Sequence, residues 1–98
     1  MIDSNMRVKI CDFGSAKFLT GKPNSPYVVT QHYRAPELYL NYSKYDSWID
    51  VWAFGCMMSE MLAGKTLIDG DNEGDQFIKI IEAVGGFKRE DWKVFIKD

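Results

Sequence analysis

The tripeptide Asp12-Phe13-Gly14 directly follows an apolar run, Val8 to Cys11, and is the stretch of this chain best suited to bind a metal ion. A carboxylate at the end of a strand can hold a hard cation such as Mg²⁺, which takes oxygen ligands and often phosphate oxygens with them. We expect Phe13 to pack inward and fix the direction of the carboxylate, and Gly14 to adopt backbone angles closed to other residues. The same tripeptide would also suit an ordinary turn after an edge strand, so its interpretation depends on the later segments of the chain.

The elements that would position this tripeptide are a short hairpin and a long loop. Residues 7–11 alternate basic and apolar side chains, which predicts a half-buried strand, and residues 15–19 are expected to form a second short strand. Glycine, proline, asparagine and serine then mark a loop over residues 20–26, which continues without periodicity to Arg34. A loop of this length inside a compact domain is usually functional or mobile.

Two helices are predicted after this loop. A helix over residues 36–40 begins with proline, whose missing N–H is not needed in the first turn. A longer helix over residues 48–63 has Ser47 as its N-cap, with Asp50 three residues later in an arrangement like a capping box. Gly64 should end this helix, since glycine readily adopts the left-handed conformation found there.

The helix over residues 48–63 is apolar on nearly all sides, so it should lie in a protein interior. A chain of 98 residues can bury only a modest fraction of its surface, and it offers few neighbours for such a helix. Cooperative stability is therefore expected to be limited.

The remaining segments complete a mostly α fold class, an α+β fragment with a short β-hairpin at its N-terminus. Residues 76–84 carry one apolar stripe and predict a further helix that ends at Gly85-Gly86. A short terminal helix is expected over residues 88–98. The length favours one small domain.

Composition and charge exclude several classes of protein. The chain is 46% hydrophobic and 14% aromatic, which is too apolar for a disordered tail. Its formal net charge of −2 gives no indication of nucleic acid or an anionic membrane as a partner. Residues 1–9 contain no apolar stretch of the signal-peptide type, and the longest apolar run, residues 51–58, is too short to span a bilayer. Cys11 and Cys56 are expected to be buried free thiols in a reducing compartment, so we expect a cytoplasmic or nuclear protein.

Three motifs stand in order along the chain. Asp12-Phe13-Gly14 follows the predicted strand, Ala35-Pro36-Glu37 follows the loop, and Asp50-Val51-Trp52 opens the apolar helix. The first two, with a phosphorylation site between them, are signatures of protein kinases. The chain resembles the middle of a eukaryotic protein kinase domain, from the metal-binding strand through the activation segment into the helical lobe.

Further motifs make the resemblance more specific. Over residues 8–85 the chain resembles the glycogen synthase kinase (shaggy) family of Ser/Thr kinases, whereas the remaining C-terminal residues match weakly. The motifs that carry this resemblance are Cys11 to Lys17, Tyr33 to Leu38, Ile49 to Trp52, Gly55-Cys56, Gly70-Asp71 and Asp75-Gln76.

The resemblance implies roles for four residues that would meet ATP or the substrate. Asp12 would ligate Mg²⁺ bridging the β- and γ-phosphates of ATP. Tyr27 would be an activation-loop phosphotyrosine, whose charge can order a loop by pairing with arginines. An ordinary aromatic residue of the loop is an equally good interpretation of Tyr27. Lys17 would belong to a basic pocket for a pre-phosphorylated substrate, the alternative being a solvated charge. Thr30 would hydrogen-bond near the catalytic base.

Other residues of the resemblance would be structural. Glu37 would form a buried ion pair with an arginine further along the chain. Asp50 would hold the backbone of the catalytic loop, which is compatible with a second role as an acid favoured by the helix dipole. His32, the single histidine, stands where the family usually has an aromatic residue, and we assign it no catalytic role.

Parts that phosphoryl transfer requires are missing from the sequence. The chain has no Gly-rich loop, no lysine-bearing strand like that of kinases and no His-Arg-Asp, and it starts only eleven residues before Asp12. We therefore expect residues 1–98 to be a partial kinase domain without the N-lobe and catalytic loop. By family it is a Ser/Thr kinase, a transferase that uses Mg²⁺ and ATP, but neither cofactor is expected to bind this chain alone and the chain alone should be inactive.

Two alternatives remain open at this point. The chain could be a non-catalytic interaction module or decoy that binds a protein substrate or a kinase-pathway partner. It could also come from a truncated gene model of an active kinase, which an in-frame His-Arg-Asp upstream of Met1 would reveal.

Overall fold

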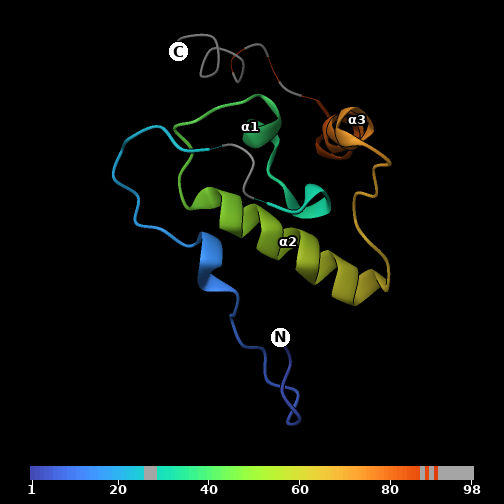
Figure 1. Ribbon diagram of the computed structural model, residues 1–98. Helices are drawn as coiled ribbons and strands as arrows, with labels where there is room; N and C mark the ends of the chain where they lie inside the picture. The colour runs from blue at the N-terminus through green and yellow to red at the C-terminus, as the bar shows by residue number, and fades with distance from the viewer. Residues whose placement is uncertain (26–28, 87, 89, 91–98) are drawn as a thin grey trace.

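The computed structural model describes residues 1–25, 29–86, 88 and 90, and almost all of its regular structure is helical (Figure 1). The mostly α fold class expected from the sequence is confirmed. The terminal helix expected over residues 88–98 falls almost entirely outside the described residues. The elements are the 3₁₀ turns η1 (Phe13–Ser15) and η2 (Gln31–Tyr33) and the helices α1 (Pro36–Tyr39), α2 (Trp48–Ala63) and α3 (Glu73–Val84).

The chain begins with a minimal hairpin over residues 1–9, closed by an antiparallel bridge between Ile2 and Val8. The N–H of Asp3 donates to the carbonyl of Arg7 at 3.0 Å, and the Asp3 carboxylate also accepts the N–H of Arg7 at 2.9 Å. An aspartate that bonds to the backbone a few residues later favours a turn over a continuing strand. The turn therefore forms among the polar residues at the very start of the chain.

The hairpin expected between residues 7–11 and residues 15–19 does not form, and both segments are exposed. Val8 and Ile10, expected on the inner side of a half-buried strand, are 63% and 85% exposed. Cys11 is exposed, contrary to expectation. The physical reason is that nothing covers this part of the chain: both segments are exposed, and η1 between them packs against no other described element, so the alternating pattern has no core to face.

A small core joins α1 to the start of α2. Ala35 and Leu38 pack with Tyr45 and Ile49, and each of these four residues is at most 9% exposed. The hydroxyl of Tyr45 donates to the carbonyl of Ser25 at 2.6 Å, which fastens the preceding loop to this core. Burying these side chains holds α1 near the first turn of α2.

The start of α2 differs from the expected capping box. Ser47 is the N-cap residue, but its side chain makes no cap hydrogen bond. Instead, the carboxylate of Asp46 accepts the N–H of Trp48 at 2.9 Å. The end of the helix is as predicted, since Gly64 has φ 70 in the left-handed region and its N–H bonds to the carbonyl of Glu60.

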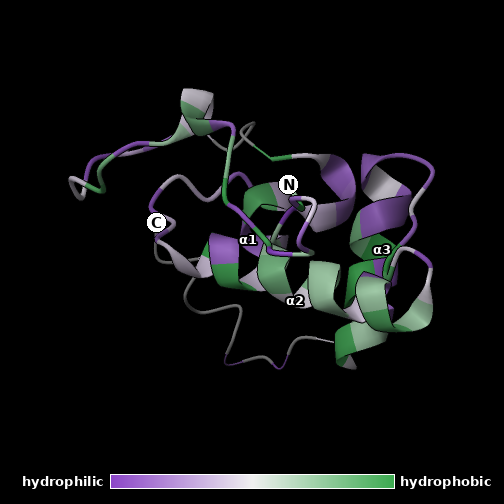
Figure 2. Ribbon diagram, turned by 90° about the horizontal axis from the view of Figure 1, so that it is seen from below, coloured by the Kyte–Doolittle hydropathy of each residue, from purple (hydrophilic) through white to green (hydrophobic). Residues whose placement is uncertain are grey.

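Most of the apolar surface of α2 is exposed, although its sequence predicted burial. Among the residues of this helix only Ile49 and Cys56 are buried, because its neighbours cover one side. Hydrophobic residues follow one another along the helix in Figure 2. The large exposed apolar residues of α2 are Trp48, Val51, Phe54, Met57, Met58, Met61 and Leu62. No helix within the described ranges is both long and apolar enough to cross a membrane.

Helix α3 starts three residues earlier than its apolar stripe predicted. Asn72 is its N-cap, and the Asn72 side chain accepts the N–H of Asp75 at 2.9 Å. Gly85 ends the helix in the left-handed conformation, as expected. The helix packs on α1 and on η2 (Figure 1). It buries Gln76 and Ile80.

Candidate functional site

Asp12 lies on an exposed segment, in the left-handed conformation with φ 63 and ψ 62, as the residue before η1. Aspartate is one of the few non-glycine residues that visit this region routinely. The unusual backbone angles expected at Gly14 are thus found at Asp12, and Gly14 is not among the positive-φ residues. Phe13 is 69% exposed and does not pack inward, because no other element covers η1 among the described residues.

The Asp12 carboxylate can serve as one ligand in a shared metal site. In the described residues no three histidine, cysteine, aspartate or glutamate side chains gather closely enough to hold a metal ion. Mg²⁺ in phosphate-transfer sites is commonly held by only one or two carboxylates, with substrate phosphates and water as the other ligands. An exposed carboxylate such as Asp12 fits that role when a nucleotide supplies the remaining oxygens.

Lys17 lies against Tyr45, a member of the small core. Its Nζ is 5.5 Å from the centre of the Tyr45 ring and 3.4 Å from the Tyr45 hydroxyl oxygen. A cation over an aromatic ring at this distance is attracted by the electron-rich face. The ring therefore holds an exposed ammonium in place, and the role of Lys17 in binding a phosphorylated substrate stays a prediction.

Thr30 is exposed and immediately precedes η2. Its carbonyl accepts the N–H of Tyr33 at 3.0 Å, whereas its side chain makes no cap hydrogen bond. Tyr27, the expected phosphorylation site, lies outside the described residues.

The two expected structural acids lie in the first turns of α1 and α2. Glu37 is half-buried, and no ion pair joins it to another of the residues that the structure describes. Asp50 is exposed, where the helix dipole favours a negative charge. Ala35, before α1, is 1% exposed, and Pro36 occupies the first turn as expected.

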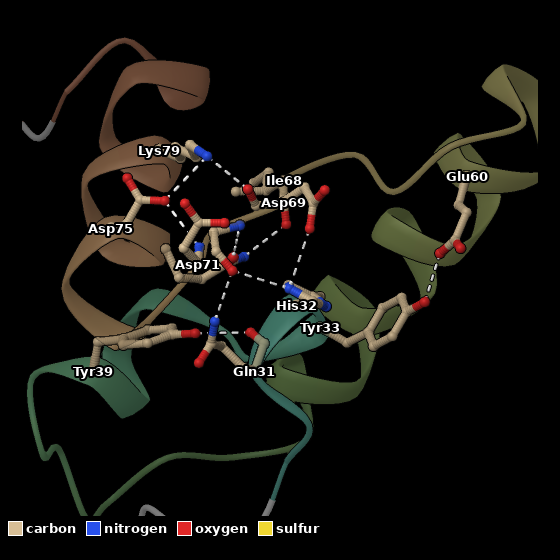
Figure 3. Close-up of polar contacts among 12 residues, drawn as sticks. Gln31, His32, Tyr33, Tyr39, Glu60, Ile68, Asp69, Asp71, Asp75 and Lys79 are labelled. Carbon is tan, nitrogen blue, oxygen red and sulfur yellow. Dashed lines mark hydrogen bonds and ion pairs between the residues drawn. The ribbon is translucent and has the colours of Figure 1, made fainter.

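The predicted site residues are not assembled into one centre. No hydrogen bond or ion pair joins any two of these five described side chains, which are Asp12, Lys17, Thr30, Glu37 and Asp50. Instead, the structure fixes η2, the segment just after Thr30, through contacts that no motif of the sequence predicted (Figure 3).

The first of these contacts joins η2 to residues 68–70, the loop before α3. Nε2 of Gln31 donates to the carbonyl of Gly70 at 3.0 Å, and Nε2 of His32 lies 3.2 Å from the same oxygen. His32 Nε2 is also 3.4 Å from a carboxylate oxygen of Asp69, as Figure 3 shows. Because a carbonyl only accepts, a hydrogen bond there requires the proton on Nε2. His32 is thus a structural contact residue.

The loop before α3 is itself fixed by Gln76. The Oε1 of Gln76 accepts the N–H of Gly70 at 2.6 Å, and its Nε2 donates to the carbonyl of Ile68 at 2.9 Å. The motif Gly70-Asp71 with Asp75-Gln76 had marked these residues as part of the resemblance. It gave no indication that the glutamine bonds to the glycine.

Arg34 makes the second link between this segment and α3. Its Nη1 donates to Glu73 Oε1 at 2.7 Å, and its Nε and Nη2 both donate to the carbonyl of Val29, at 3.1 and 3.0 Å. The guanidinium also lies 5.2 Å from the centre of the Tyr39 ring on α1. Residues 29–34 are therefore held against both α1 and α3.

The pKa values of several titratable groups are shifted by these contacts and by burial. The hydrogen bond to Glu60 raises the pKa of Tyr33, and burial raises the pKa of Tyr39 and of the Cys56 thiol. The Cys56 thiol is therefore held in its neutral, unreactive form. The N–H of Asp71 and the Lys79 ammonium lower the pKa of Asp75. These groups are structural, and none of them is a predicted catalytic residue.

A comparison with known families identifies the chain. The model of the protein kinase domain matches residues 1–96, which is nearly the whole sequence. The nearly strand-free helical fold of the described residues agrees with a fragment of the helical lobe of such a domain. Protein kinases transfer phosphate from ATP to protein substrates, generally with Mg²⁺. The chain belongs to the protein kinase domain family.

Proposed function

We propose that this chain is the metal-binding and activation segment, with the following helices, of a Ser/Thr protein kinase domain of the glycogen synthase kinase (shaggy) type. The observation that carries the proposal is the order of Asp12-Phe13-Gly14, Ala35-Pro36-Glu37 and Asp50-Val51-Trp52 within the matched residues. In such a domain almost the whole rate comes from positioning and electrostatic stabilisation of the transferred phosphate. To this positioning and stabilisation, the chain contributes one metal ligand and a surface that binds the substrate.

The metal ligand is Asp12. When bound, Mg²⁺ neutralises charge on the β- and γ-phosphates of ATP. The Asp12 carboxylate is exposed, so it can turn its oxygens toward a nucleotide held by other parts of the domain. The substrate surface includes two exposed residues, Thr30 and Lys17, and the Lys17 ammonium would attract a phosphate already present on the substrate.

We further propose that these 98 residues alone transfer no phosphate, because the sequence has no Gly-rich loop, no kinase-like strand lysine and no His-Arg-Asp. The isolated chain, incubated with Mg-ATP and a serine-containing peptide, should produce no phosphopeptide and show no thermal shift. Transfer by the wild-type chain that disappears in Asp12→Asn would overturn this part of the proposal.

The kinase type can be tested in a chimera, in which residues 8–85 replace the matching stretch of an active shaggy-type kinase. The chimera should phosphorylate serine or threonine, and it should prefer a peptide that already carries a phosphate. Lys17→Ala should reduce that preference, whereas Lys65→Ala, an exposed lysine after α2, should leave it unchanged. Equal rates on both peptides, with the parent kinase still selective, would refute the shaggy-type assignment.

The exposed apolar side of α2 supports a second candidate function, which is binding to a kinase-pathway protein without catalysis. An apolar patch of this kind commonly marks an interaction site. Titration of the chain with a purified shaggy-type kinase should then give saturable binding, weakened by Phe54→Ser together with Met58→Ser. Both residues are exposed on α2. Absence of binding at micromolar concentrations would count against this function.

A further inference from the structure

Gln76 is the most completely buried polar residue of the described chain, with 0% of its surface exposed. Its side-chain amide spans the loop before α3, with Oε1 on the N–H of Gly70 and Nε2 on the carbonyl of Ile68. A buried amide that uses both its donor and its acceptor specifies one orientation, because any other would leave polar groups without partners. The amide therefore fixes the path of residues 68–70.

Close packing leaves this loop little freedom to shift. A Cβ atom added at Gly70 would come within 2.4 Å of the Cα and 2.5 Å of the backbone nitrogen of Gln76. Only glycine allows the backbone to approach α3 this closely. The direction of the Gly70 carbonyl is thus set jointly by the Gln76 amide and by this approach.

The Gly70 carbonyl is the point where the loop meets η2. It accepts from Nε2 of Gln31 at 3.0 Å and lies 3.2 Å from Nε2 of His32. The backbone of Gln31 is held on its other side, since its carbonyl accepts the hydroxyl of Tyr39 at 2.7 Å (Figure 3). Gln31 and His32 directly follow Thr30, so whatever fixes Gly70 also limits where Thr30 can lie.

We propose that Gln76 is a positioning residue for residues 29–34, the segment that carries Thr30. It acts through the Gly70 carbonyl, and it sets the orientation of the segment from α3, without touching the reacting atoms itself. The description of this segment as substrate-facing rests on the proposed function, whereas the coupling from Gln76 to Gln31 does not.

A second tie between α3 and this segment, from Arg34 to Glu73, does not replace the first. The Glu73 side chain is 61% exposed, and an ion pair with one partner in solvent contributes little. Both bonds of Gln76 lie in the interior, where a lost partner is not replaced by water. Most of the coupling should therefore pass through Gln76.

Amide hydrogen exchange of the full chain, followed by NMR, tests the inference. The N–H groups of Tyr33 and Arg34 bond to the carbonyls of Thr30 and Gln31, so their exchange reports the order of η2. Gln76→Ala should accelerate exchange at these two amides about tenfold or more, while exchange along α2 changes less than about twofold. Ile78→Ala, at an exposed position of the same helix, is the matched control and should change neither.

If Gln76→Ala destabilises the whole fold, a second variant tests the coupling from Gln76 to η2. Gln31→Ala removes only the bond to the Gly70 carbonyl, and it should also accelerate exchange at Tyr33 and Arg34 without affecting α2. In the double variant the two effects should be clearly less than additive, because both substitutions break the same chain of contacts. Additive effects, unchanged exchange in Gln31→Ala, or no protection of the two amides in the wild-type chain would each overturn the inference.

The exchange experiment involves no catalysis, so its result is independent of the kinase assays. A chimera without kinase activity would refute the proposed function and leave the coupling intact. Unaltered exchange in the variants would refute the coupling and leave the kinase assignment untouched.

Discussion

The hydroxyl of Tyr33 donates a hydrogen bond to Oε2 of Glu60, at 2.5 Å. This contact joins η2 to the last turns of α2, as Figure 3 shows from the facing side chains. Since Arg34 and Gln31 tie the same segment to α3 and its preceding loop, η2 is where the helices of the described chain meet. Residues 29–34 are thus better fixed than the tripeptide Asp12-Phe13-Gly14 that precedes them.

Removing the Tyr33 hydroxyl should weaken the fold. Tyr33→Phe keeps the ring and deletes one hydrogen bond to a carboxylate, so the free energy of unfolding should fall by about 1 kcal/mol. Urea unfolding followed by tryptophan fluorescence measures this change. Glu60→Gln is the matched control, since it keeps an acceptor and should cost less. A variant Tyr33→Phe as stable as the wild type would show that this bond contributes nothing.

The same contact predicts a pH dependence at the alkaline end. The bond to Glu60 raises the pKa of Tyr33 above its ordinary value of 10.0, because the protonated hydroxyl is the donor. A raised folded-state pKa means that this stabilisation is complete below pH 10 and is lost as the pH rises through the folded-state pKa. Unfolding free energies measured above pH 10 should therefore fall more steeply for the wild type than for Tyr33→Phe. Parallel curves would contradict the assignment.

Two glycines should respond in opposite ways to alanine. Gly70→Ala forces a methyl group against the backbone of Gln76 and should destabilise the chain by about 1–3 kcal/mol. At Gly55, inside α2, no atom of the described residues beyond the adjoining helix backbone lies within 4 Å of the position that a Cβ would take. Gly55→Ala should therefore stabilise the chain by up to about 1 kcal/mol, through helix propensity. Chemical denaturation of both variants measures the difference, and equal effects would contradict the described packing.

The helices and their ends could largely be predicted from the sequence. Pro36 marks the start of α1, Gly64 and Gly85 mark the ends of α2 and α3, and each reflects a local backbone preference. The order of the three motifs also predicted the family, which the match over residues 1–96 shows.

Features that depend on contacts between distant residues could not be predicted in this way. Alternation in residues 7–11 predicted a half-buried strand, but burial requires a partner element, and all five of these residues are exposed. The prediction that Phe13 packs inward was wrong for the same reason. The bond between Gln76 and Gly70 depends on a loop folding back on a helix, which no periodicity reveals. The side chain that accepts a backbone N–H at the start of α2 belongs to Asp46 rather than to the N-cap residue Ser47, although both are good capping types.

The most direct test of the account is the rate of phosphate transfer by the chimera that carries residues 8–85, measured with and without Asp12→Asn. The substitution keeps the size of the side chain and removes the charge that would hold Mg²⁺, so the rate should fall on the order of a hundredfold or more. Asp71→Asn, an exposed acid before α3, is the control and should leave the rate unchanged. An active chimera whose rate is unaffected by Asp12→Asn would contradict the claim that this chain supplies the metal ligand.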